Sequence, residues 1–141
     1  VAGTWAHWAC AATVATPTVA IYRNGVDDSS TSTNTAATAI NNNARNFNMS
    51  GWWDAVPAFQ FPADGLIDEV RVWNTLRTAA QISENYNKHI DPQANLVGYW
   101  RLNNDYTDLS GNGNTLTPSG SPVFSTDVPF VVPEGNYSFF M

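Results

Sequence analysis

Short oxygen-bearing side chains alternate around a glycine late in the chain. Asp108, Ser110, Asn112 and Asn114 stand at every second position, and Gly113 separates the last two. A hard cation such as Ca²⁺ takes about six to eight oxygen ligands from a flexible loop, and this spacing offers carboxylate, hydroxyl and amide oxygens to one ion. The same residue types also form Asx-turns, in which the side chains hydrogen-bond their own backbone. Calcium binding and a plain turn therefore both stay open at this point.

Asp68 is a second candidate because it lies in an apolar stretch. Residues 66–73 alternate as in a β-strand, which places Asp68 on one face with Leu66, Val70 and Val72. A bare carboxylate among valines is costly unless it is paired, protonated or bound to a metal. Asp68 is therefore expected to have a partner.

The carboxylates do not form a catalytic pair. Glycan-cleaving enzymes place two carboxylates across a cleft, roughly 5 to 9 Å apart. Asp68 and Glu69 are neighbours and so face opposite sides of a strand, and the chain holds no Glu-x-Asp, Glu-x-Glu or Asp-x-Asp-x-Glu pattern. His7 and His89 have no Ser or Cys nucleophile elbow beside them. The sequence therefore predicts that the protein is not an enzyme and has no catalytic residue.

Two adjacent tryptophans, Trp52 and Trp53, are the candidate ligand-binding residues, together with Asp54. Tryptophan rings stack on the apolar faces of pyranose rings, while Asp and Asn side chains hydrogen-bond the hydroxyls. Several asparagines precede this stretch, between residues 41 and 48, and its composition indicates a loop. Packing of the two tryptophans into a core or an interface is an equally good interpretation.

Charge and composition argue against several classes of partner. The net charge is −6 and Lys88 is the one lysine, so clustered cations that would bind nucleic acid or an anionic membrane are missing. No apolar run approaches the roughly 20 residues that membrane insertion requires. Few charged residues and many Asn, Ser and Thr favour an extracellular, cell-surface or virion-surface protein. Cys10 has no second cysteine to pair with, and because it shares a face with Trp8 and Ala12 we expect a buried, inert thiol.

The elements that would position these residues are mostly strands. Asn24 and Gly25 favour a tight type I′ turn, because both central residues of that turn need positive φ. Thr78 and Gln81 have the spacing of a capping box at a helix start. We expect strands over residues 4–15, 18–23, 66–73 and 96–102, and a helix over 78–89.

Four segments of the chain carry a resemblance to a known family. They are residues 3–9, 19–26, 65–82 and 96–114. In this order they resemble laminin G-like, concanavalin A-like lectin/glucanase jelly-roll domains, although the leading strands of the family are missing before Trp5. The resemblance implies an all-β fold, an antiparallel jelly-roll β-sandwich with one short helix near 78–89. Residues 1–90 would hold its mid-to-late strands and the helix, and residues 91–141 would complete the same sandwich or begin a second one.

The resemblance also implies a metal site. In the family, the Asp of the Ile-Asp-Glu-Val segment and the Gly-Asn loop can lie together at a calcium ion. The expected cofactor is therefore Ca²⁺, and the expected ligands are Asp68, Asp108, Asn112 and Asn114.

The sequence as a whole predicts a non-catalytic extracellular recognition or adhesion module that binds glycans or surface proteins. The alternative is a structural subunit of an extracellular filament or a virion-surface assembly, with no small ligand. Missing leading strands would leave a sheet edge open, and an open edge favours self-association. Strands after residue 96 are expected to pair with the earlier part of the chain, or alternatively with a neighbouring molecule.

Overall fold

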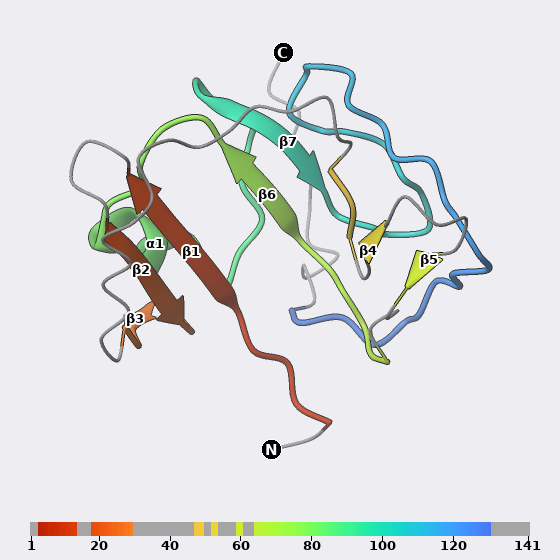
Figure 1. Cartoon of the computed structure of the whole chain (residues 1–141), viewed down its shortest axis with the longest axis horizontal. Coiled ribbons are helices and arrows are strands. Elements are labelled where there is room, and N and C mark those ends of the chain that lie inside the picture. The colour runs from red at the N-terminus through yellow and green to blue at the C-terminus, as the bar shows by residue number, and fades with distance from the viewer. Residues whose placement is uncertain are drawn as a thin grey trace, which may run out of the picture.

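The structure is a computed structural model that describes residues 3–13, 18–29, 47–49, 52–53, 59–60 and 64–130. Its elements are, in chain order, β1 (Trp8–Thr13), β2 (Thr18–Arg23), β3 (Val26–Asp27), β4 (Trp52–Trp53), β5 (Phe59–Gln60), β6 (Val70–Trp73), α1 (Ala79–Asn85) and β7 (Leu96–Trp100) (Figure 1). The strands pair antiparallel in the orders β1-β2-β3, β4-β5 and β6-β7. Antiparallel sheets with one short helix agree with the expected all-β class.

The N-terminal hairpin follows the local sequence signals. β1 and β2 pair from Trp8 opposite Arg23 to Thr13 opposite Thr18. The turn into β3 has φ of 50° at Asn24 and 77° at Gly25, as a type I′ turn requires. This confirms the turn that was expected from the Asn-Gly pair.

The strand expected over residues 66–73 begins only at Val70. Glu69 has a φ of 55°, in the left-handed region, and this interrupts the extended backbone before β6. The predicted alternation from Leu66 is therefore wrong for residues 66–69 but holds from Val70 onward. β6 pairs with β7, so a strand after residue 96 pairs within the chain.

Helix α1 is shorter than expected. Thr78 Oγ1 accepts a hydrogen bond from Gln81 N at 3.2 Å, and Gln81 Oε1 accepts one from Thr78 N at 3.1 Å. This reciprocal pair is the predicted capping box. The helix ends at Asn85 rather than at residue 89, and Ile82 is its buried residue.

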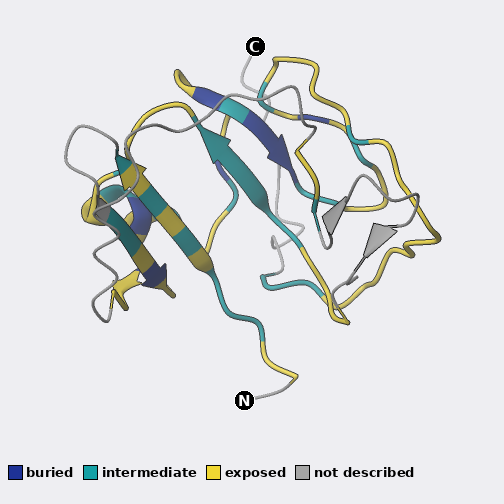
Figure 2. Cartoon of the chain, in the orientation of Figure 1, coloured by how far each residue is buried: buried dark blue, intermediate teal, exposed yellow. Residues whose placement is uncertain are grey.

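The core of the described part is built around β7. Ile90, Leu96 and Tyr99 form a buried cluster, and Trp73 packs against it. Trp100 is also buried, and its ring lies over Gly98, where an added Cβ would come within 2.2 Å of a ring carbon. A glycine at position 98 is therefore what allows the ring to lie flat along the strand. In Figure 2, β7 is accordingly the most buried of the strands whose burial is described.

The hairpin of β1 and β2 is much more exposed. The residues of β1 alternate between exposed and intermediate, starting from Trp8, whose side chain is 60% exposed (Figure 2). Cys10 is exposed, so the expected buried thiol is wrong. The physical reason is that no described element covers the face that Trp8 and Cys10 share.

Candidate functional site

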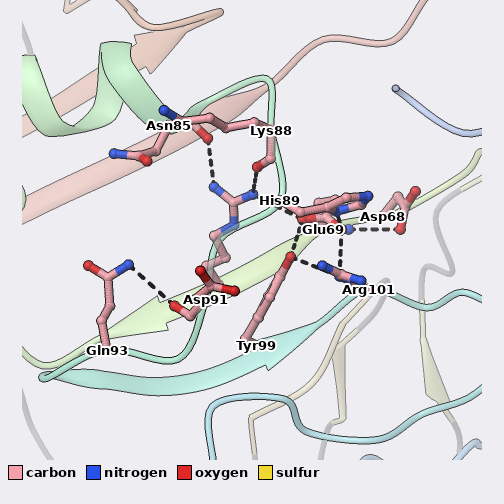
Figure 3. Close-up of polar contacts among 10 residues, drawn as sticks. Asp68, Glu69, Asn85, Lys88, His89, Asp91, Gln93, Tyr99 and Arg101 are labelled. Carbon is pink, nitrogen blue, oxygen red and sulfur yellow. Dashed lines mark hydrogen bonds and ion pairs between the residues drawn. The ribbon is translucent and has the colours of Figure 1, made fainter. Parts of the chain in front are cut away.

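The carboxylate of Glu69 is the centre of a cluster of polar side chains (Figure 3). Its side chain is only 7% exposed. Oε2 accepts hydrogen bonds from Arg71 Nη2 at 2.9 Å and from the Tyr99 hydroxyl at 2.7 Å. Oε1 lies 2.6 Å from His89 Nδ1 and 3.8 Å from Arg101 Nε. Both oxygens of this buried carboxylate are thus engaged.

The local backbone explains how Glu69 reaches these partners. Its positive φ turns the chain just before β6, and its N–H is held by Asp68 Oδ1 at 2.9 Å. Arg71, two residues further on, stands opposite Tyr99 in the β6–β7 ladder. The strand register therefore places Arg71 beside Tyr99, and both side chains donate to the carboxylate of Glu69.

Arg71 extends the cluster toward the end of the helix. Its Nη1 donates to the carbonyl oxygen of Asn85 at 2.7 Å, and its Nη2 donates to the carbonyl oxygen of Lys88 (Figure 3). These carbonyls belong to the last residue of α1 and the turn after it, where a helix leaves acceptors unpaired. Arg71 thereby fastens the C-terminal end of α1 to β6.

Asp68 is half-buried and lies beside the cluster rather than inside it (Figure 3). Burial is the main reason why the pKa of Asp68 is raised, and the hydrogen bond from Glu69 N opposes that shift. The charges of His89 and Arg101 also act to lower this pKa. The expected partner of Asp68 is therefore the backbone of its own neighbour.

The loop after β7 is organised by Asp108, which is 8% exposed. Its Oδ1 accepts from Tyr99 N at 3.0 Å and Ser110 N at 2.8 Å, and its Oδ2 accepts from Ser110 Oγ at 2.9 Å and Asn114 N at 2.8 Å. Burial acts to raise the pKa of Asp108, but these hydrogen bonds outweigh it and the pKa is lowered. The loop has the side-chain-to-backbone bonding of the Asx-turn alternative.

The side-chain amides of Asn112 and Asn114 hydrogen-bond the backbone of β7. Asn112 Nδ2 donates to Leu96 O at 2.7 Å, and Asn114 Nδ2 donates to Val97 O at 2.8 Å. Of the four expected metal ligands, Asp108, Asn112 and Asn114 thus share one loop, whereas the recorded hydrogen bond of Asp68 is to Glu69. Among the described residues, no three His, Cys, Asp or Glu side chains gather as a metal site would need.

The expected sugar platform is only partly described. Trp52 and Trp53 form β4 and pair with Gln60 and Phe59 of β5, so their backbone is a short strand rather than the expected loop. Asp54 lies outside the described residues.

Sequence reasoning missed the Glu69 cluster. The Glu-x-Arg spacing of residues 69 and 71 was an available signal, because side chains two apart in a strand share a face. His89 and Tyr99 are 20 and 30 residues from Glu69, so no local pattern could join them to it.

Replacing Glu69 with Gln tests the cluster. The variant leaves Arg71, which is 10% exposed, without its counter-charge, and breaking such a buried pair costs about 3 to 5 kcal/mol. We expect a loss of this size in the free energy of unfolding measured with urea. Glu84→Gln on the exposed side of α1 is the control, with an expected change within about 0.5 kcal/mol. Equal stability of the two variants would contradict the central role of Glu69.

The N-terminal part of the chain matches a known protein family. Residues 1–83 match the Laminin_G_3 family model, described as the concanavalin A-like lectin/glucanases superfamily. No curated protein and no solved structure matches the chain. The matched range covers more than half of the 141 residues and runs from before β1 into α1. The chain therefore belongs to the laminin G-like branch of the concanavalin A-like superfamily.

Proposed function

We propose that this protein is a non-catalytic recognition or adhesion module that acts outside the cell and binds glycans or surface proteins. Family membership supports a carbohydrate- or protein-binding domain. We further propose that the complete domain is a jelly-roll β-sandwich, to which the antiparallel sheets described here would belong. No helix of the described chain is long and apolar enough to cross a bilayer.

Among the described residues, the two most buried carboxylates support the proposal that the protein is not an enzyme. Glu69 is held by Arg71, His89 and Tyr99. Asp108 accepts four hydrogen bonds from its own loop and from β7. A general acid or nucleophile needs a carboxylate oxygen within reach of the substrate, and these oxygens are occupied by structural partners.

Glycan binding is proposed for Trp52, Trp53 and Asp54. Separate Trp52→Ala and Trp53→Ala variants are needed, because successive strand residues as a rule face opposite sides. We expect at least one of them to abolish binding on a glycan array, since a stacked aromatic ring supplies much of the contact with a sugar. Trp8→Ala removes an exposed tryptophan from another sheet and should leave binding intact. An array without any bound glycan, with and without Ca²⁺, would refute the lectin function.

Calcium binding by Asp68, Asp108, Asn112 and Asn114 is also proposed. An ion bound only by the folded state stabilises it, so EDTA should lower the melting temperature and added Ca²⁺ should restore it. Asp68→Asn should remove this sensitivity, because Asp68 is the expected ligand that lies outside the Asp108 loop. The hydrogen bonds already made by Asp108 compete with the ion. A melting curve that EDTA leaves unchanged would contradict the calcium site.

The alternative function is structural, as a subunit of an extracellular filament or virion-surface assembly. It is favoured by exposed apolar side chains on the hairpin, where Trp8 is 60% and Val26 is 68% exposed. Under this alternative, sedimentation should find an obligate polymer at micromolar concentration, because the uncovered face would be buried between copies. A stable monomer would instead support the recognition module.

A further inference from the structure

A cleft of about 1470 Å³ is lined by residues of β1 and β6, together with residues of α1 and of the segments that flank these elements. Its walls include Trp8 and Cys10 on one side, Val70 and Arg71 on the other, and His7 and Tyr86. Figure 1 shows β1 and β6 side by side, with both arrows pointing the same way and with β2 and β7 running in the opposite direction outside them. Each of the two sheets therefore turns one edge strand, β1 or β6, toward the cleft.

The pairing of β2 shows which backbone groups of β1 face this cleft. Arg23 and Val26 close a two-residue hairpin turn, so Arg23 directs its N–H and C=O toward β3. Trp8, opposite Arg23, is then in a pair without mutual hydrogen bonds and turns its backbone groups away from β2. The pattern repeats at every second residue. Trp8, Cys10 and Ala12 therefore direct their N–H and C=O groups toward the cleft.

Tyr99 defines the free edge of β6 in the same way. Its N–H donates to Asp108 and its C=O accepts from Leu109 N at 2.8 Å, so both groups point away from β6. Arg71, opposite Tyr99, is in a pair without mutual hydrogen bonds and turns its N–H and C=O toward the cleft. In the described part of the chain, these backbone groups of β1 and of Arg71 have no recorded hydrogen-bond partner.

Two buried side-chain nitrogens at the cleft are also without a partner among the described residues. They are His7 Nδ1 and Arg71 Nε. Arg71 is nine-tenths buried, and its other nitrogens are already used by Glu69 and by the carbonyls of Asn85 and Lys88. A buried N–H without an acceptor is costly, so the edge that Arg71 occupies is not fully satisfied within the described chain.

We propose that the β1–β6 cleft binds an extended segment of another polypeptide as an added β-strand. The segment would run antiparallel to both β1 and β6 and would join them into one continuous antiparallel sheet. The backbone groups on both walls call for a polypeptide, because only a main chain offers donors and acceptors alternately to its two sides. A span of about six residues would match the six residues of β1. This site is separate from the proposed glycan site and does not depend on it.

Side-chain chemistry adds a preference for the bound strand. On the face that Arg71 and His7 occupy, a polar side chain with an acceptor oxygen, such as Asp, Asn or Ser, would suit these two basic residues, which line the cleft. On the opposite face the strand would continue the apolar surface of Trp8 and Cys10, so Val, Ile or Thr fits there.

The test uses fluorescein-labelled heptapeptides that alternate Val, Ile or Thr with Asp, Asn or Ser, titrated into the whole protein by fluorescence anisotropy. For the best binder, each inner amide is then N-methylated in turn. A strand held on both sides uses every N–H, so every N-methyl should weaken binding about tenfold or more. Cys10→Pro removes a cleft-facing N–H and should have the same effect, with circular dichroism as the check on folding.

Five outcomes would overturn the proposal. No binding by any peptide of the set would do so, as would binding that tolerates N-methylation. Loss at every second amide alone would show pairing with a single edge. Binding that appears only after deletion of residues 131–141, or self-association of the protein that excludes the peptides, would show that this chain or a second copy fills the cleft. If Cys10→Pro fails to fold, the N-methyl scan decides by itself.

Discussion

A buried carboxylate cannot stay charged without partners, and Glu69 meets this constraint with side chains from several parts of the chain. Arg71 comes from β6, which begins directly after Glu69, Tyr99 comes from β7, and His89 comes from the segment after the helix. Each contact also fixes a relation between elements: β6 to β7 through Tyr99, and β6 to the end of α1 through Arg71. Removing an ion from water costs several kcal/mol, so the cluster is favourable only with all of these elements in place. It therefore makes the arrangement of β6, β7 and α1 cooperative.

Tyr99 links the Glu69 cluster to the loop after β7. Its side chain is 1% exposed and its hydroxyl donates to Glu69, while its backbone N–H donates to Asp108 and its C=O accepts from Leu109. One residue thus joins a carboxylate inside the family-matched range, residues 1–83, to a carboxylate beyond it. This explains in physical terms why residues 96–114 belong with the earlier strands, although the family match ends before them.

The features that sequence predicted correctly are those decided within a few residues. The Asn24-Gly25 turn and the Thr78–Gln81 capping box depend on local φ and on side chains three apart, and both are present. The strand start at residue 66 and the burial of Cys10 were wrong, because each depends on distant contacts. Glu69 adopts a positive φ and hydrogen-bonds partners 20 and 30 residues away in the sequence. Cys10 would be buried only if another layer of the structure covered its face. At Asp108, turn and metal loop share the same residue types, so spacing alone could not separate them.

The edge of β1 that faces the cleft is not protected against pairing with another strand. Natural sheets protect a free edge with lysine, proline, an inward charge or a bulge, because unpaired N–H and C=O groups recruit other strands. β1 has the sequence Trp-Ala-Cys-Ala-Ala-Thr and pairs with β2 over its whole length without a bulge. It carries none of these protective devices, and Arg71 on β6 turns its backbone N–H and C=O toward the same cleft. A strand that is regular and uncharged is suited to the middle of a sheet. The structure of β1 is therefore that of an interior strand, and pairing on both of its sides is the state for which its residues are suited.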